Sequence, residues 1–147
     1  MVIAAGVVTL DQLTKVWAVA GLSDRSVELI DGFLQLRLTR NPGAAFSSFT
    51  GGGSFLAVIS AIVAIAIAFL LPQIEERLDR LALSLVMGGA LGNVADRIFR
   101  GDGFLDGAVV DFIDFSFWPT FNAADSAISI GVVLMLFAAL FRKEPAL

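Results

Sequence analysis

Two aspartates stand where a carboxylate is costly. Asp111 lies within the apolar segment VVDFIDF, and Asp125 lies near the start of an otherwise apolar run that continues to Phe141. A carboxylate in such surroundings is unfavourable unless it is paired, hydrogen-bonded or used in chemistry. Two carboxylates in one site do not both ionise easily, so such a pair can hold a single proton. One acid can then activate a water while the other protonates a carbonyl oxygen, which suits hydrolysis of a peptide bond.

The surroundings of the two acids differ. Asp125 falls in the first turn of an expected helix, where the helix dipole favours a carboxylate. Asp111 has Val and Phe neighbours and should keep a proton more readily. Asp125 as base and Asp111 as acid is therefore a working hypothesis for a pair that titrates as a unit.

The amino acids that are missing narrow the chemistry. The 147-residue chain has no His and no Cys. This composition excludes a Ser-His-Asp triad, a thiolate nucleophile, disulfides and zinc sites built from Cys. Proton transfer falls to Asp, Glu or Lys, and we expect neither a metal nor another cofactor. The formal net charge of -4 offers no basic patch for phosphates, so nucleic acid is not an expected partner.

The elements that position these acids are membrane helices. Hydrophobic residues make up 57% of the chain, too many for an ordinary soluble domain. A membrane-spanning helix needs about 20 apolar residues. The sequence predicts an all-α membrane protein, with residues 1–147 forming a single integral membrane domain. Four spans are expected, at about 1–20, 55–71, 81–99 and 123–141.

Orientation depends on the basic tail after the fourth span. Lys and Arg in the loops are almost evenly divided between the two sides, but the short RKEP tail favours a cytoplasmic C-terminus. Four spans then place the N-terminus in the cytoplasm with the 72–80 loop, and the loops at about 21–54 and 100–122 face outward. The first span is expected to be a retained helix rather than a cleaved signal peptide, because polar residues interrupt it. The lack of basic residues before it leaves open a start further upstream.

The two outer loops carry different patterns. In the first, VELI and FLQLRLT flank Asp31-Gly32, which predicts a small extracytoplasmic β-hairpin or sheet with a two-residue turn. The second is rich in Phe and Val, which is typical of the membrane interface, and predicts an interfacial loop along the bilayer surface.

Polar residues with helical spacing occur at the outward ends of three spans: Asp11, Thr14 and Lys15; Asn93, Asp96 and Arg97; Asn122 and Asp125. Each group alone has an ordinary explanation, namely an internal ion pair, a helix end with an Asp–Arg pair, and a capping box. Asn41 and Gly43 in NPG also fit an ordinary turn. Because all these helix ends face one side, however, their side chains should meet at one depth, and charged groups inside a bilayer usually mark a functional cavity.

Five blocks occur in order along these spans: DQLTK from Asp11, NPGAAFS from Asn41, GGALGNVADR from Gly88, VVDF from Val109 and FNAADSAISIG from Phe121. With their connecting segments they cover nearly the whole chain. In these blocks the sequence resembles the lipoprotein signal peptidase, or signal peptidase II, family of four-helix aspartic peptidases. The stretch FRGDGFLDGA is longer than in many members, which affects a loop and none of the blocks.

The resemblance implies that Asp111 and Asp125 are the catalytic dyad. It also implies supporting roles for eight residues: Asp11, Lys15, Asn41, Gly43, Asn93, Asp96, Arg97 and Asn122. The implied substrate is a prolipoprotein whose lipobox cysteine carries diacylglycerol, cut just before that cysteine at the interface of the bacterial cytoplasmic membrane. The family is also the target of the antibiotic globomycin. We further expect membrane lipids as partners, a monomeric enzyme, and no catalytic role for Asp114.

Two other functions remain open from the residues alone. Intramembrane Asp and Lys also mark proton relays, so a small proton- or ion-coupled transporter is the main alternative. A non-catalytic assembly partner that packs through Gly88-Gly89 is another. The polar residues gather near one face instead of stepping across the bilayer, which favours the peptidase.

Overall fold

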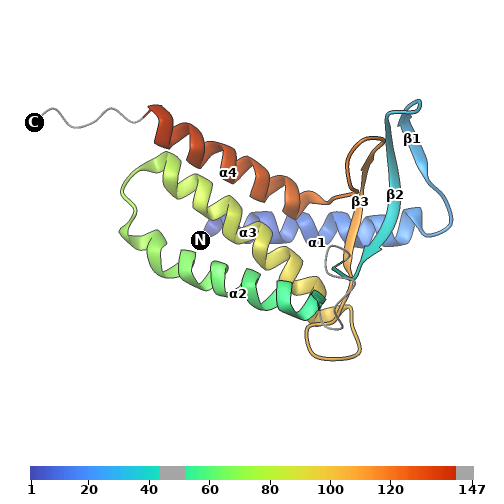
Figure 1. The fold of residues 1–147 in the computed structure, drawn as a ribbon, viewed down its shortest axis with the longest axis horizontal. Helices are drawn as coiled ribbons and strands as arrows, with labels where there is room; N and C mark the ends of the chain where they lie inside the picture. Colours follow the sequence, from blue (N-terminus) through green and yellow to red (C-terminus); the bar gives the residue numbers. More distant parts are fainter. Residues whose placement is uncertain (44–51, 142–147) are drawn as a thin grey trace, which may run out of the picture.

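Four long helices form the body of the molecule. The structure is a computed structural model, and it describes residues 1–43 and 52–141. The helices are α1 (Val2–Leu22), α2 (Gly52–Leu70), α3 (Arg77–Phe99) and α4 (Ala123–Phe141). All four are long and apolar enough to cross a membrane, which confirms the four predicted spans. A small sheet packs across one end of the helical bundle, here called the sheet end (Figure 1).

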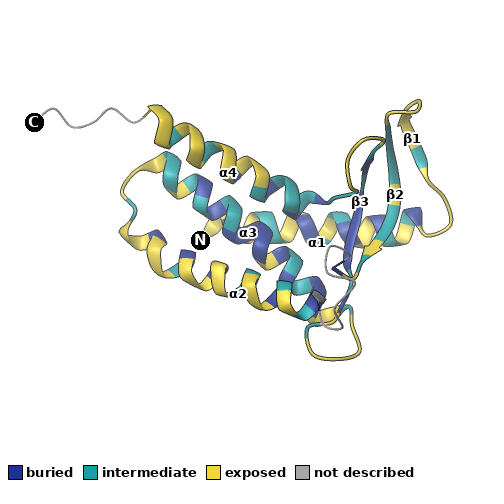
Figure 2. Cartoon of the chain, viewed as in Figure 1, coloured by how far each residue is buried: buried dark blue, intermediate teal, exposed yellow. Residues whose placement is uncertain are grey.

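Helix α3 is the centre of the bundle. It lies between α2 and α4 in Figure 1 and packs against α1, α2 and α4. Of its spanning window 56% is buried, against 22%, 22% and 17% in the other three spans, and Figure 2 shows their outward faces as mostly exposed. Small residues allow this close approach: a Cβ on Gly88 would lie 2.7 Å from Cβ of Val7, and one on Gly89 would collide with the carbonyl of Ala124.

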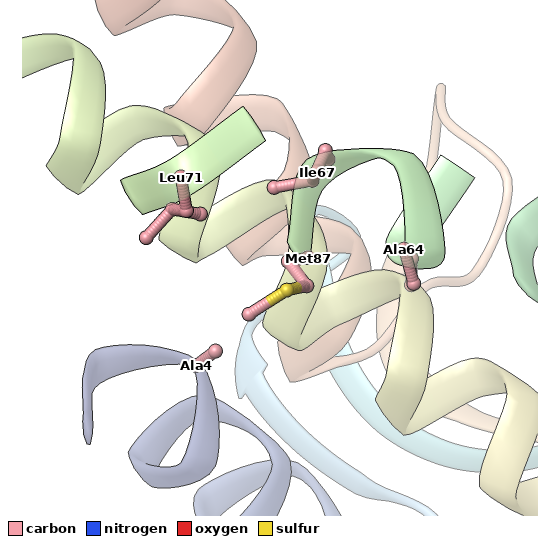
Figure 3. Packing of buried hydrophobic residues seen from close by; sticks show 6 residues of the cluster. Ala4, Ala64, Ile67, Leu71 and Met87 are labelled. Carbon is pink, nitrogen blue, oxygen red and sulfur yellow. The ribbon is translucent and has the colours of Figure 1, made fainter. Parts of the chain in front are cut away.

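An apolar core holds the bundle at the end away from the sheet, here called the distal end. Its six buried residues are Ala4, Ala64, Ile67, Leu71, Met87 and Ala90. Met87, only 1% exposed, extends between α1 and α2 (Figure 3). Burial of apolar surface therefore joins α1, α2 and α3 at this end.

Three antiparallel strands form the sheet in the order β1-β2-β3: β1 (Val27–Ile30), β2 (Leu34–Asn41) and β3 (Val109–Phe115). The predicted hairpin is confirmed, but its two-residue turn is wrong. Ile30 pairs with Leu34, so the turn has three residues, 31–33, with Gly32 in the left-handed region at φ 61°. An irregularity in β1 between Glu28 and Ile30 changes the register.

Strand β3 corrects the prediction of a continuous interfacial loop over residues 100–122. The segment VVDFIDF pairs with β2 and carries Asp111 on a strand. Val110 and Phe112 pack against Ala18 and Leu22 at the end of α1, while Asp111 is buried as well. Because both faces of the strand are covered, the sequence lacks the simple apolar–polar alternation of a half-exposed strand.

The structure also shifts the boundaries of three spans, and α2 begins at Gly52 rather than near residue 55. Helix α3 begins at Arg77 and not near residue 81, because its first turn is polar and lies outside the apolar run. The predicted 72–80 loop consequently shrinks to a short 3-10 turn, Leu71–Gln73, and three further residues. Helix α1 runs to Leu22.

Candidate active site

Asp111 and Asp125 line the same cavity at the sheet end. Asp111 comes from β3, and Asp125 comes from the first turn of α4. The cavity has a volume of about 200 Å³. Its other lining residues come from α2, α3 and the ends of two strands: Asn41, Leu56, Ala57, Ser60, Asn93, Val94, Arg97 and Val109. The structure thus brings the two predicted acids into one small polar site.

Asp111 is buried, with 2% of its surface exposed. Its Oδ1 accepts a hydrogen bond from Nδ2 of Asn122 (2.7 Å), and its Oδ2 accepts one from Nδ2 of Asn41 (3.2 Å). Burial, and next the negative charge of Asp125, raise the pKa of Asp111 to about 6, although the two amides and the charge of Lys15 act against this. Asp111 therefore keeps its proton to a higher pH than an ordinary aspartate does.

Asp125 is fixed by a capping box, as the sequence predicted. Its backbone N–H donates to Oδ1 of Asn122 (2.9 Å), and the backbone N–H of Asn122 donates to Oδ2 of Asp125 (3.2 Å). The second carboxylate oxygen, Oδ1, accepts a hydrogen bond from Nδ2 of Asn93 (2.8 Å). The cap and the site therefore use the same carboxylate, so the capping explanation and the catalytic one do not exclude each other.

Asn122 connects the two acids. Besides capping α4, its side-chain amide donates to Asp111 and to Oδ1 of Asn93 (3.2 Å). Asn122 is fully buried. One residue thus touches Asp111, Asp125 and the amide that binds Asp125, which fixes the three groups relative to each other.

A buried ionic cluster lies next to the cavity. Nζ of Lys15 is 2.8 Å from Oδ2 of Asp11 and 2.8 Å from Oδ2 of Asp96, and all three side chains are fully buried. Lys15 also donates to Oδ1 of Asn93 (2.9 Å). The internal ion pair expected on the first span is present, and it extends to α3. Thr14 does not join it, because its hydroxyl donates to backbone carbonyls of its own helix.

The polar end of α3 is arranged differently from the expected Asp–Arg pair. Asp96 pairs with Arg100 (2.8 Å) as well as Lys15, whereas Nη1 of Arg97 donates to the carbonyl of Gly107 (3.0 Å). The Arg97 guanidinium lies against the start of α2, where a Cβ on Gly53 would be 2.7 Å from Nη1. Arg97 thereby joins the 100–108 connection to the cavity wall.

The NPG turn at the end of β2 serves the site. The backbone N–H of Gly43, at φ 96°, donates to Oδ1 of Asn41 (2.9 Å), which leaves Nδ2 of Asn41 facing Asp111. The same Asn41 side chain therefore stabilises the turn through its oxygen and binds Asp111 through its nitrogen. Residues 44–47, the rest of the NPGAAFS block, lie outside the described residues.

Asp114 is absent from the residues that line the cavity. Its carboxylate accepts hydrogen bonds from Gln35 (2.8 Å), Arg37 (2.9 Å) and Thr120 (3.2 Å). Partial burial acts to raise the pKa of Asp114, but these donors, with the charge of Arg37, outweigh it and hold the pKa below its usual value. Asp114 is thus a structural ion-pair partner within the sheet.

Sequence reasoning missed Gln12. Its Nε2 lies 3.1 Å from each of three acceptors: Oδ2 of Asp11, Oδ1 of Asp96 and the carbonyl of Gly92. The signal was present as a polar amide next to Asp11 inside an apolar span.

In the described ranges, no group of three or more acidic side chains is arranged to hold a metal ion.

Comparison with known proteins finds matches over nearly the whole chain. The family model for signal peptidase (SPase) II matches residues 3–141. A lipoprotein signal peptidase of Rhodococcus jostii (strain RHA1) is 44% identical over 145 residues, covering 98% of this chain and 73% of that protein. One from Mycobacterium leprae (strain Br4923) is 41% identical over 140 residues, covering 95% and 70%.

Two solved structures of bacterial membrane enzymes, determined by the in meso method, have the same fold. One gives a TM-score of 0.78 at 37% identity, covering 97% of this chain and 92% of that chain. The other gives 0.77 at 36% identity, covering 99% and 92%. The match over nearly the whole length shows that this chain belongs to the signal peptidase II family of bacterial membrane proteins and is a signal peptidase rather than a transporter.

Proposed function

We propose that this protein is an aspartic endopeptidase that removes the signal peptide from diacylglyceryl-modified prolipoproteins, cutting just before the lipidated cysteine. Asp111 and Asp125 are the catalytic dyad in this proposal. The observation that carries it is their place in one cavity, joined through Asn122. The other predicted site residues support them through the contacts described above.

The different surroundings of the acids assign their roles. Asp125 accepts hydrogen bonds from Nδ2 of Asn93 and from the backbone N–H of Asn122, and it is the base in this proposal. Asp111 has a pKa raised to about 6 and is the acid. The carboxylate of Asp125 takes a proton from water while the water oxygen bonds to the scissile carbonyl carbon. Asp111 gives its proton to the carbonyl oxygen, which forms a neutral tetrahedral diol.

Breakdown of the diol returns the dyad to its starting state. Asp125 gives its proton to the amide nitrogen as the C–N bond breaks. Asp111 takes a proton back from one hydroxyl as the new carboxyl group forms. The pair then holds one proton again, and the step needs no cofactor.

The position of the cavity suits a lipidated substrate. A signal peptide with an acylated cysteine is a membrane helix whose acyl chains lie in the same leaflet as its cleavage site. The cavity lies at the sheet end, where Phe104, Phe117 and Trp118 are exposed at positions typical of a membrane interface. We infer that this end faces outward from the cytoplasmic membrane, that both termini are cytoplasmic, and that the enzyme acts as a monomer among membrane lipids.

Cleavage of a diacylglyceryl-modified precursor by the purified protein tests this function. Asp111→Asn and Asp125→Asn should each abolish cleavage while the protein still inserts and folds, because either change removes the shared proton or the base. Precursor without the diacylglyceryl group should be a poor substrate. Full activity in either single variant would show that Asp111 and Asp125 are not a catalytic dyad. Inhibition by EDTA would indicate that the carboxylates bind a metal ion.

A further inference from the structure

Lys15 is a fully buried cation whose three hydrogens are all accounted for. They face Oδ2 of Asp11, Oδ2 of Asp96 and Oδ1 of Asn93, at 2.8, 2.8 and 2.9 Å. Burying a lysine with two carboxylates seldom adds stability compared with apolar side chains of similar volume. Because its hydrogens are directed at protein acceptors, Lys15 is suited to act through its neighbours rather than on a substrate.

Both carboxylates that Lys15 holds also bind the backbone next to a catalytic acid. Oδ1 of Asp11 accepts a hydrogen bond from the backbone N–H of Ala124, the residue before Asp125 (3.0 Å). Oδ2 of Asp96 accepts one from the backbone N–H of Val110, the residue before Asp111 (3.1 Å). A continuous path of hydrogen bonds therefore runs from the start of α4 through Lys15 to β3.

Lys15 also orients the amide that binds Asp125. The cation can pair only with the oxygen of the Asn93 amide, and Nδ2 of Asn122 donates to this oxygen as well. The NH₂ group of Asn93 must then face the other way, toward Oδ1 of Asp125. Without the cation, the Asn93 amide would lose one of the two donors that fix its orientation.

Gln12 is a second tie between the same carboxylates. Its amide lies 3.1 Å from Asp11 and from Asp96, parallel to the bridge through Lys15. The fit around this bridge is tight, since a Cβ on Gly92 would lie 2.6 Å from Oδ2 of Asp11. We call Asp11, Gln12, Lys15 and Asp96 the brace.

We propose that Lys15 and Gln12 are positioning residues, which through the brace fix the separation and relative orientation of the Asp111 and Asp125 carboxyl groups. The inference rests on the proposed function and adds to it the part of the molecule that sets the geometry of the dyad. The ionic cluster then has two roles. It lowers the cost of placing polar residues of the first span in the membrane, and it aligns the two catalytic carboxyl groups. Such alignment is worth a large factor in rate, because a displacement of about 1 Å can cost roughly 100-fold.

The brace can be removed without leaving a charge on any of its own residues, although Arg100, whose side chain is 20% exposed, loses its ion-pair partner Asp96. Lys15→Met alone leaves the buried Asp11 carboxylate without its cation and leaves Asp96 with Arg100 alone. It is therefore combined with Asp11→Asn and Asp96→Asn, which keep oxygens for the backbone N–H groups of Ala124 and Val110. We expect this triple variant to fold, to lose roughly 100-fold in kcat and to keep KM within about threefold. A residue that bound substrate would change KM.

Gln12→Leu removes the second tie without affecting any charge, so it keeps the test decisive should the triple variant fail to fold. Its kcat should fall roughly tenfold, equivalent to the loss of one charge-assisted hydrogen bond, with KM unchanged. Arg37→Met is the matched control, because it breaks the Arg37–Asp114 pair at the same end but away from the cavity. Its kcat should stay within about twofold.

The outcomes separate the brace from the dyad. Wild-type kcat per folded molecule in Gln12→Leu, or in a folded triple variant, would overturn the brace, as would losses that appear in KM alone. Cleavage by Asp111→Asn is measured in parallel and tests the dyad independently of the brace. An inactive Asp111→Asn supports the catalytic dyad whatever the brace variants do, and an active one would rule the dyad out.

Discussion

The two ends of the helical bundle are held together by different physics. At the distal end, apolar side chains such as Ile67, Leu71 and Met87 are buried against each other. At the sheet end, the groups between the helices include an ion and an amide that are fully buried, Lys15 and Asn122. Apolar packing tolerates changes that conserve volume, whereas a buried polar network requires each donor and acceptor in place. The distal end therefore contributes stability through apolar packing, whereas the polar network at the sheet end, beside a second apolar cluster of Ala18, Leu22, Val110 and Phe112, supplies geometry.

The same contrast occurs within one strand. Asp111 and Asp114 lie three residues apart on β3, yet burial and Asp125 raise the pKa of the first, and Arg37 with two polar side chains lowers that of the second. Residue type and neighbourhood in the sequence do not distinguish them. Their partners do, because Asn122 and Asn41 place Asp111 in the cavity while Gln35 and Arg37 hold Asp114 in the sheet.

The largest effect should be the pH dependence that Asp111 gives to stability. Its folded pKa of about 6 exceeds the ordinary 3.8, so its favourable contribution is present below 3.8 and is lost as pH rises through about 6. By pH 8 the loss is roughly 3 kcal/mol. Asp111→Asn stays neutral, so its unfolding temperature minus that of the wild type should increase between pH 5 and pH 8. If this difference in unfolding temperature did not depend on pH, the buried site would tolerate an ionised Asp111 as well as a protonated one.

Asn122 tests whether the sheet end supplies geometry apart from stability. Asn122→Ala loses both the helix cap and the bridge, whereas Asn122→Ser keeps a capping hydroxyl but cannot reach Asp111. Both variants should lose roughly 100-fold in kcat for the lipidated precursor. Because it lacks a capping group, Asn122→Ala should in addition be less stable to unfolding than Asn122→Ser by about 1 kcal/mol. Wild-type kcat in Asn122→Ser would show that the bridge is dispensable.

Met87→Leu makes a similar conservative change at the distal end. Because the two side chains have nearly equal volume, the unfolding free energy should change by less than about 1.5 kcal/mol. Cleavage should proceed at the wild-type rate, measured in the same assay. A large loss of kcat without a loss of stability would break the division between the two ends.

Asp114→Asn should have the smallest effect. It removes the ion pair with Arg37, whose side chain is 54% exposed, and such pairs are worth about 0–1 kcal/mol. The kcat should remain within about threefold of the wild type. Inactivity as severe as in Asp111→Asn would show that the wrong acid on β3 has been assigned to the dyad.

Local signals predicted much of this molecule. The four spans follow from runs of apolar residues, and the Asn122–Asp125 capping box follows from a spacing of three. The Asp11–Lys15 pair follows from a spacing of four. Each of these features is formed within one helix or at its end, so a single stretch of sequence contains it.

The features that were missed depend on distant parts of the chain. Strand β3 pairs with β2, and the contact between Asn41 and Asp111 joins residues 70 positions apart. Gln12 reaches Asp96 across 84 positions. The sequence predicted that the polar helix ends meet at one depth, but the individual partners depend on helix rotation and on close approach at glycines such as Gly92.

Titration of the two carboxyl groups tests the central claim most directly, since catalysis here requires that Asp111 and Asp125 share one proton. Infrared difference spectroscopy of the protein in lipid detects a protonated carboxyl group by its C=O band. The band of one buried carboxylic acid should disappear as pH rises through about 6, should be missing in Asp111→Asn, and should shift to lower pH in Asp125→Asn because the neighbouring charge is gone. The account would be contradicted if both carboxyl groups were already ionised at pH 5. It would also be contradicted if the band of Asp125→Asn disappeared at the same pH as the band of the wild type.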